Sequence, residues 1–256
     1  MRIRKLLCCL LALAMLPVCL GWTTAAEKPA VLREDEKIPL DWFADAAIVG
    51  DSITGVLEDY CNRTGGLGEA LFLCPSSYSV HNAISGDVMI WFQGAARPVE
   101  EALELSGATK AFFMLGVNDV ARSGGVERTM ELWHQLLERI RERCPELQLY
   151  VESCLPVYRY ADYLPDGNGV IDSYNEELRQ FCEDEGLVYV DIAHLFKDEH
   201  NALADEFCSD QYVHVTFEAA ALWIDLLRDP FRYSVNPLAD ARKSKAFNKE
   251  DRSTMG

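Results

Sequence analysis

Short apolar runs that alternate with helical segments constrain the fold of this chain more than any other feature. Four of these runs are nearly continuous, at residues 46–49, 111–115, 147–151 and 187–190, and a weaker one covers residues 78–80. Apolar runs of this kind are typical of strands that are covered on both faces. The sequence therefore predicts a buried parallel sheet of about five strands.

Helical periodicity fills the stretches between and after these runs. In residues 126–143, apolar side chains recur at spacings of three and four and form one stripe for burial. The other predicted helices cover residues 53–61, 99–105, 171–185 and 217–227. Strands that alternate with helices pair through right-handed crossovers, so we expect an α/β fold, a three-layer α/β/α sandwich.

The two ends of the chain differ from this pattern. Residues 1–26 combine three basic residues, an apolar run and a small-residue site before Glu27, which is typical of a secretory signal peptide. A signal peptide implies that the protein is secreted or exported to the cell envelope. The apolar run is too short to favour a membrane-spanning helix, so we expect no stable insertion into the membrane. Residues 27–40 lead into a domain at residues 41–232, and we expect the polar residues 233–256 to be disordered.

Charge and cysteine content narrow the range of partners. The formal net charge is −17, and it becomes −20 without the three basic residues of the leader. Because phosphate backbones repel such a chain, we expect no nucleic acid partner. Six cysteines follow the leader, and they allow disulfides whose pairing the sequence does not define. No close Cys/His cluster is present, so we expect neither a metal nor another cofactor.

Polar residues of the kinds that carry out catalysis occur in four short strings, at residues 48–53, 82–87, 115–119 and 210–214. Ser52 follows an apolar run and precedes a helical segment, which places its hydroxyl at a strand end beside a positive helix terminus. His214 offers an imidazole base with Asp210 nearby, and serine needs such partners to act as a nucleophile. Ser52 and Asn118 both fall at carboxyl ends of strands, where parallel sheets bind ligands.

Each of these residues taken alone also has a structural interpretation. Ser52 is also a good helix N-cap, Gly86 a turn glycine with positive φ, and Asn118 a loop residue that holds its own turn. Asp51 is better explained as a hydrogen-bonding residue of the turn than as a catalytic acid. The ordered set of four strings carries more weight than any single member.

In order and content the four strings resemble the blocks of the SGNH hydrolases, also called GDSL esterases and lipases, over about residues 41–230. The resemblance implies a flavodoxin-like parallel sheet and the catalytic roles of the strings. Ser52 would be the nucleophile and His214 the general base. The backbone amides of Ser52 and Gly86 and the side chain of Asn118 would form the oxyanion hole.

The acid departs from the pattern of that family, which usually has an aspartate three residues before the histidine. That position holds Gln211, and Asp210 stands four residues ahead of His214. A bulged turn would absorb the extra residue and keep Asp210 as the acid. The alternative is a slower Ser–His dyad that is assisted by Gln211 or by a backbone carbonyl.

These features predict a secreted serine esterase that forms an acyl-enzyme on Ser52 and acts on short acyl esters, such as acetyl groups on carbohydrates. Three alternatives remain open: a lysophospholipase or other lipid esterase, acyl transfer to a sugar hydroxyl, and a noncatalytic glycan-binding protein. We expect the segment at residues 155–175 to overhang the active face. Its tyrosines would pack, stack on a sugar or line an acyl pocket: Tyr158, Tyr160 and Tyr163.

Overall fold

The computed structural model describes residues 36–122, 124–164 and 167–230. The predicted signal peptide at residues 1–26 and the predicted tail at residues 233–256 lie outside the described residues, as does most of the lead-in. The described lead-in ends at a short 3₁₀ helix, Leu40–Phe43. Just before it, Ile38 exchanges hydrogen bonds with Arg228, so the two ends of the described domain lie side by side.

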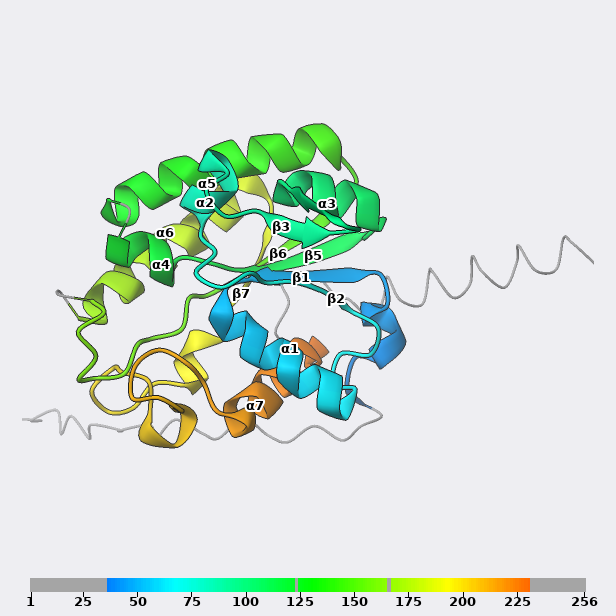
Figure 1. Cartoon of the computed structure of the whole chain (residues 1–256). Coiled ribbons are helices and arrows are strands. Elements are labelled where there is room, and N and C mark those ends of the chain that lie inside the picture. The colour runs from blue at the N-terminus through cyan, green and yellow to red at the C-terminus, as the bar shows by residue number, and fades with distance from the viewer. Residues whose placement is uncertain (1–35, 123, 165–166, 231–256) are drawn as a thin grey trace, which may run out of the picture. The chain divides into compact units, whose positions relative to one another are not determined.

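A parallel five-stranded sheet forms the centre of the domain, as predicted (Figure 1). Its strands follow the spatial order β2-β1-β5-β6-β7, which is the flavodoxin-like order. The chain passes from β1 to one side of the sheet and returns to the other, so β1 and β5 flank the switch point. The strands are β1 (Ala46–Gly50), β2 (Leu71–Leu73), β5 (Lys110–Met114), β6 (Gln148–Glu152) and β7 (Val188–Val190).

Helices cover both faces of the sheet and complete the predicted three layers (Figure 1). One layer holds α1 (Ser52–Thr64) and α7 (Phe217–Leu227), which pack together. All five predicted helices are present, and α2 and α4 are additional short ones. The other layer holds α2 (Val80–Ser85), α3 (Val99–Ser106), α4 (Val117–Arg122), α5 (Gly125–Arg143) and α6 (Gly169–Glu185).

Alternate side chains of the strands build the two halves of the core. Phe112 stacks on Tyr150 across β5 and β6, with ring centroids 4.5 Å apart, on the face that also meets Trp42. The next residue, Phe113, points to the opposite face and meets Trp133 of α5 at 5.9 Å. This alternation explains why the strands are continuously apolar in sequence.

The prediction of a weak strand at residues 78–80 is wrong. The fifth strand is β2 at Leu71–Leu73, which pairs with β1 in parallel. Ser79 instead caps helix α2, because its hydroxyl accepts the N–H of Asn82 at 3.0 Å. Asp119 reinforces this helix start from a distant part of the chain, by accepting the N–H groups of Val80 and His81.

A small antiparallel hairpin was not predicted. It joins β3 (Ile90–Phe92) to β4 (Ala95–Arg97) through Gln93 and Gly94, both with positive φ. Two residues with positive φ make the type I′ turn that suits a two-residue hairpin loop. Its strands have only three residues each, which is too short for an alternating pattern to stand out.

Within the described ranges, each of the six cysteines is a free thiol: Cys61, Cys74, Cys144, Cys154, Cys182 and Cys208. The described part of the chain contains no group of three or more His, Cys, Asp or Glu side chains that could hold a metal ion. In this part of the chain we find no helix with the length and apolar character that crossing a bilayer requires.

One buried carboxyl should make the free energy of unfolding depend on pH. Glu152 at the end of β6 is fully buried and accepts the indole N–H of Trp223 at 2.6 Å, and burial raises its pKa from about 4.5 to about 8. The folded protein therefore holds a proton that the unfolded chain releases, and stability falls as pH rises between these two values. Glu152→Gln removes this dependence, so its stability relative to the wild type should rise with pH.

Denaturant unfolding at about pH 5 and about pH 8 measures this difference. The control is Glu142→Gln, which changes an exposed carboxylate of α5. The difference in unfolding free energy between this variant and the wild type should be the same at both pH values. If the stability difference between Glu152→Gln and the wild type were also the same at both pH values, the pKa of Glu152 would not be raised in the folded protein.

Candidate active site

The junction of β1 and α1 places Ser52 at the carboxyl edge of the sheet. Asp51 is the N-cap of α1, and its Oδ1 accepts the N–H of Ile53 at 2.8 Å, which leaves the Ser52 hydroxyl out of the cap. Gly50 permits this tight entry, because a Cβ there would lie 1.9 Å from the Thr54 hydroxyl oxygen. The structural interpretation of Ser52 as the N-cap is therefore wrong, and that of Asp51 as a turn residue is correct.

His214 lies against Ser52 although the two residues are 162 positions apart. Its Nε2 is 3.0 Å from Ser52 Oγ, and its Nδ1 is 2.6 Å from Asp210 Oδ2. The imidazole and the carboxylate are each about one-third exposed, at 36% and 34%. The three groups stand in line as nucleophile, base and orienting acid do in acyl transfer.

The loop before α7 absorbs the extra residue between Asp210 and His214. Gln211 adopts a left-handed conformation with φ of 56°, and Ser209 N–H bonds to His214 O at 2.9 Å to close the loop. Inside it, Asp210 Oδ1 accepts the N–H groups of Tyr212, Val213 and His214 at 2.8–3.2 Å. This bulged turn places the Asp210 carboxylate against the His214 ring, and Gln211 is exposed.

The electrostatics of Asp210 favour its ionised form. Burial alone would raise its pKa, but the hydrogen bonds from the His214 ring and from the backbone N–H groups outweigh burial and hold the pKa below its usual value. A charged Asp210 fixes the His214 tautomer with its Nδ1 proton toward the carboxylate, which leaves Nε2 free to accept a proton from Ser52.

Asn118 reaches the site from the neighbouring strand end. It follows β5 in the first turn of α4, after Gly116, where a Cβ would lie 2.2 Å from the ring of Tyr174. Its Nδ2 donates to Asp51 Oδ2 at 2.7 Å and to Tyr78 O at 3.2 Å. The amide nitrogen of Asn118 is thus directed toward the residue that precedes Ser52.

Two buried carboxyls stand behind this edge of the sheet. Burial raises the pKa of Asp51 and of Asp119 to about 6 each, despite the N–H groups that both accept. Asp51 links Ser52 to Asn118, whereas Asp119 holds the start of α2. Both carboxyls therefore support the backbone around the site and point away from solvent.

Gly86 requires a correction. It ends α2 in the left-handed conformation, with φ of 79°, and its N–H donates to Asn82 O at 2.9 Å. The amide that we expected in the oxyanion hole therefore closes a helix, and an oxyanion there would have to break the last bond of α2, whereas Asn118 would give up only a long side-chain contact. The alternative interpretation of Gly86, a glycine needed for positive φ, describes it correctly.

We predict that Gly86→Ala lowers stability by about 1 kcal/mol, because an L residue is strained at this φ, and changes kcat/KM less than about twofold. Gly107→Ala is the matched control, since Gly107 ends α3 in the same conformation and neither site would crowd a Cβ. Thermal unfolding and ester hydrolysis should give the same result for both variants. A large loss of kcat/KM in Gly86→Ala alone would return Gly86 to the site.

Tyr163 and Tyr212 are site residues whose partners the sequence did not reveal. The Tyr163 hydroxyl donates to Asn118 Oδ1 at 2.5 Å, and its ring meets that of Tyr212 edge to face at 5.2 Å. We expect the segment at residues 155–175 to overhang this face, and Tyr163 of that segment contacts Asn118 there. Tyr160 remains 77% exposed.

Fold and site together define an ester hydrolase of the SGNH type. The sequence profile of the GDSL-like lipase/acylhydrolase family matches residues 48–222, so the chain belongs to this family and is a carboxylic ester hydrolase. The departure at Gln211 was the reason to consider a noncatalytic protein, but the Asp210 carboxylate contacts the His214 ring. No curated protein matches the chain significantly.

Solved structures share the fold at low sequence identity. A GDSL-like lipase from Bacteroides thetaiotaomicron has a TM-score of 0.56 at 16% identity, over 77% of this chain and 89% of its own. An acetyl xylan esterase has a TM-score of 0.54 at 14% identity, over 71% and 97%. A carbohydrate esterase family 3 protein from Talaromyces cellulolyticus has a TM-score of 0.50 at 13% identity, over 71% and 93%.

Proposed function

We propose that this chain is an exported serine esterase in which Ser52 carries the acyl group between two half-reactions. The observation that supports this most directly is the line of contacts from Ser52 Oγ to His214 Nε2 at 3.0 Å and from His214 Nδ1 to Asp210 Oδ2 at 2.6 Å. Export rests on the sequence of residues 1–26 alone.

In the first half-reaction, Ser52 Oγ attacks the ester carbonyl while its proton passes to His214 Nε2. The tetrahedral intermediate collapses, the bond to the alkoxide breaks, and His214 returns the proton to the leaving alcohol. In the second half-reaction, His214 takes a proton from water as that water attacks the acyl-enzyme. As the second intermediate collapses, the bond between Ser52 Oγ and the acyl carbon breaks, His214 returns the proton to Ser52 Oγ, and the carboxylic acid leaves.

Charge that develops on the carbonyl oxygen needs hydrogen-bond donors. The N–H of Ser52 lies at the start of α1, where helical N–H groups have no intrahelical acceptor. Asn118 Nδ2 is the second proposed donor, and its longer contact, 3.2 Å to Tyr78 O, is the one that an oxyanion would displace. Each such donor typically lowers the barrier by about 3 kcal/mol.

For the substrate, we propose a short acyl ester, with an acetyl group on a carbohydrate as the preferred class. The net charge of −17 opposes anionic lipid surfaces, and the aromatic rings of Tyr163 and Tyr212 offer a stacking surface beside the site. One solved structure of this fold is an acetyl xylan esterase, but at 14% identity that likeness supports the fold and not the substrate.

Hydrolysis of p-nitrophenyl acetate, butyrate and octanoate, together with acetate release from acetylated xylan, tests this proposal. We expect kcat/KM to fall with chain length and acetate to be released from the polymer. Highest activity on octanoate or on a lysophospholipid would favour the lipid esterase instead. Analysis of products with an added glycan acceptor separates hydrolysis from acyl transfer, because only transfer yields an acylated acceptor.

A further inference from the structure

We propose that Tyr163 is a positioning residue that fixes the orientation of the Asn118 amide and couples it to the loop of Asp210 and His214. The inference rests on the proposed function, because it assigns a role within the same site. The Tyr163 hydroxyl acts through Asn118 and its ring packs on Tyr212. A sugar stacked on the ring would be a separate contact, which Tyr163→Phe leaves in place.

Hydrogen bonds on both sides of the Asn118 amide select one of its two orientations. An amide presents an acceptor oxygen and a donor nitrogen of nearly equal size, so only its partners determine which end points where. Tyr163 donates to Oδ1 at 2.5 Å, and Asp51 accepts from Nδ2 at 2.7 Å. The nitrogen therefore faces the Ser52 side, as an oxyanion donor must.

The hydrogen bond from Tyr163 also makes Asn118 a better donor. Accepting a bond at the amide oxygen polarises the group and strengthens the N–H bonds that its nitrogen donates. Asn118 is buried, at 8% exposure, and the effect is larger where water does not compete. Loss of the Tyr163 hydroxyl would leave Oδ1 without this donor and Nδ2 a weaker one.

Tyr212 connects the same phenol to the acid loop. Its ring meets that of Tyr163 at 5.2 Å with an interplanar angle of 88°, and its carbonyl accepts the N–H of Tyr158 at 2.8 Å. Its own N–H donates to Asp210 Oδ1 at 2.8 Å. The segment that carries Tyr163 therefore bonds to the loop that aligns Asp210 with His214.

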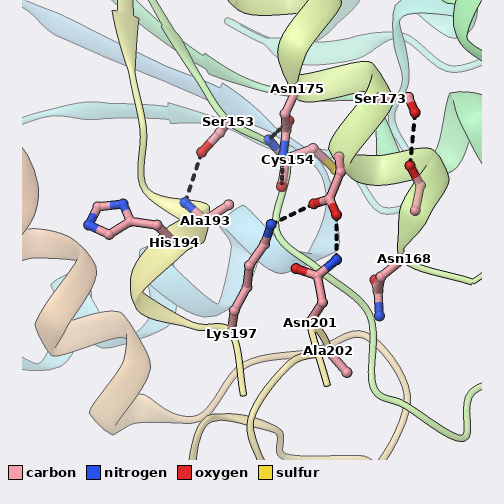
Figure 2. A network of polar contacts seen from close by, with 12 residues as sticks. Ser153, Cys154, Asn168, Ser173, Asn175, Ala193, His194, Lys197, Asn201 and Ala202 are labelled. Carbon is pink, nitrogen blue, oxygen red and sulfur yellow. Dashed lines mark hydrogen bonds and ion pairs between the residues drawn. The ribbon is translucent and has the colours of Figure 1, made fainter. Parts of the chain in front are cut away.

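That segment has a firm base, which a positioning role requires. Asn168 accepts the N–H of Val157 at 2.7 Å and donates to its carbonyl at 2.8 Å, which closes the segment into a loop. Asn175 makes the same pair of contacts with Cys154, both at 2.8 Å (Figure 2).

The loop beneath this segment is anchored to α6. Figure 2 shows Lys197 and Asn201 converging on one carboxylate, which belongs to Asp172. From the same loop, Leu203 N–H bonds to Val157 O at 3.0 Å. Tyr163 thus projects from a loop that is held at its entry, at its exit and from below.

The test compares Tyr163→Phe with Tyr160→Phe, which removes a hydroxyl from an exposed tyrosine of the same segment. With p-nitrophenyl acetate, we expect Tyr163→Phe to lower kcat/KM about tenfold, through kcat and with KM nearly unchanged. Tyr160→Phe should match the wild type. An unchanged kcat in Tyr163→Phe, or an equal loss in Tyr160→Phe, would overturn the inference.

A double-mutant cycle then asks whether Tyr163 acts through Asn118. We expect Tyr163→Phe to have little further effect in the background of Asn118→Ala, or of Asn118→Ser if the alanine variant is unstable. The same tenfold loss in that background would show that Tyr163 acts independently. Ser52→Ala is measured in parallel, since activity that survives it refutes the proposed function, whereas the Tyr163 variants refute only this inference.

Discussion

Ser52→Ala should lower kcat/KM for p-nitrophenyl acetate by about 10⁴-fold or more, because no other group takes over the role of a lost nucleophile. The variant should fold normally. Asp51, not Ser52, caps helix α1, so removal of the Ser52 hydroxyl costs no cap hydrogen bond. The loss of activity would therefore be chemical and not structural.

Ser173→Ala is the matched control for this experiment. Ser173 is an exposed serine of α6 whose hydroxyl bonds only to the local carbonyl of Gly169 among the described contacts (Figure 2). Its activity and its thermal unfolding should match the wild type. If Ser52→Ala retained activity comparable to this control, Ser52 would not be the nucleophile.

Asp210→Asn should cause the second large effect, a loss of about 10³-fold or more in kcat/KM with little change in KM. Asparagine keeps the volume but loses the charge that orients His214 and stabilises its protonated form. It still accepts the three N–H groups at Oδ1, so the loop should persist. Steady-state kinetics at several pH values separates this loss from a shift in the pH optimum.

Gln211→Gly tests the alternative of a Ser–His dyad that Gln211 assists. Gln211 is exposed and has φ of 56°, a conformation that glycine adopts freely, so this variant should keep wild-type activity and gain slight stability. If Gln211→Gly lost more activity than Asp210→Asn, the Ser–His dyad assisted by Gln211 would be the better account.

Local patterns in the sequence were enough to predict most of the fold. The apolar runs that became β1, β5, β6 and β7 are buried on both faces, so nearly every residue in them had to be apolar. The stripe in residues 126–143 likewise reports the one buried face of α5. Strand β2 was missed although it is as short as β7, and only its last residue, Leu73, is buried, so its apolar side chains do not report a strand covered on both faces.

The site was predictable where one residue type and its neighbours specify the chemistry. Ser52 after a strand, and His214 with a carboxylate nearby, are such cases, and the structure places them in contact. Gly86 could not be judged in this way, because a glycine amide serves a helix end or an oxyanion depending on where α2 stops. Tyr163 depends on a contact 45 residues away, which no local pattern encodes.

Direct detection of the acyl-enzyme tests the central claim best. The protein is mixed with p-nitrophenyl acetate, quenched rapidly in acid and digested, and its peptides are analysed by mass spectrometry. We predict one acetyl group on the peptide that contains Ser52, and none on that peptide in Ser52→Ala. Rapid ester hydrolysis with the acetyl group on another residue, or with the same labelling in Ser52→Ala, would contradict the claim.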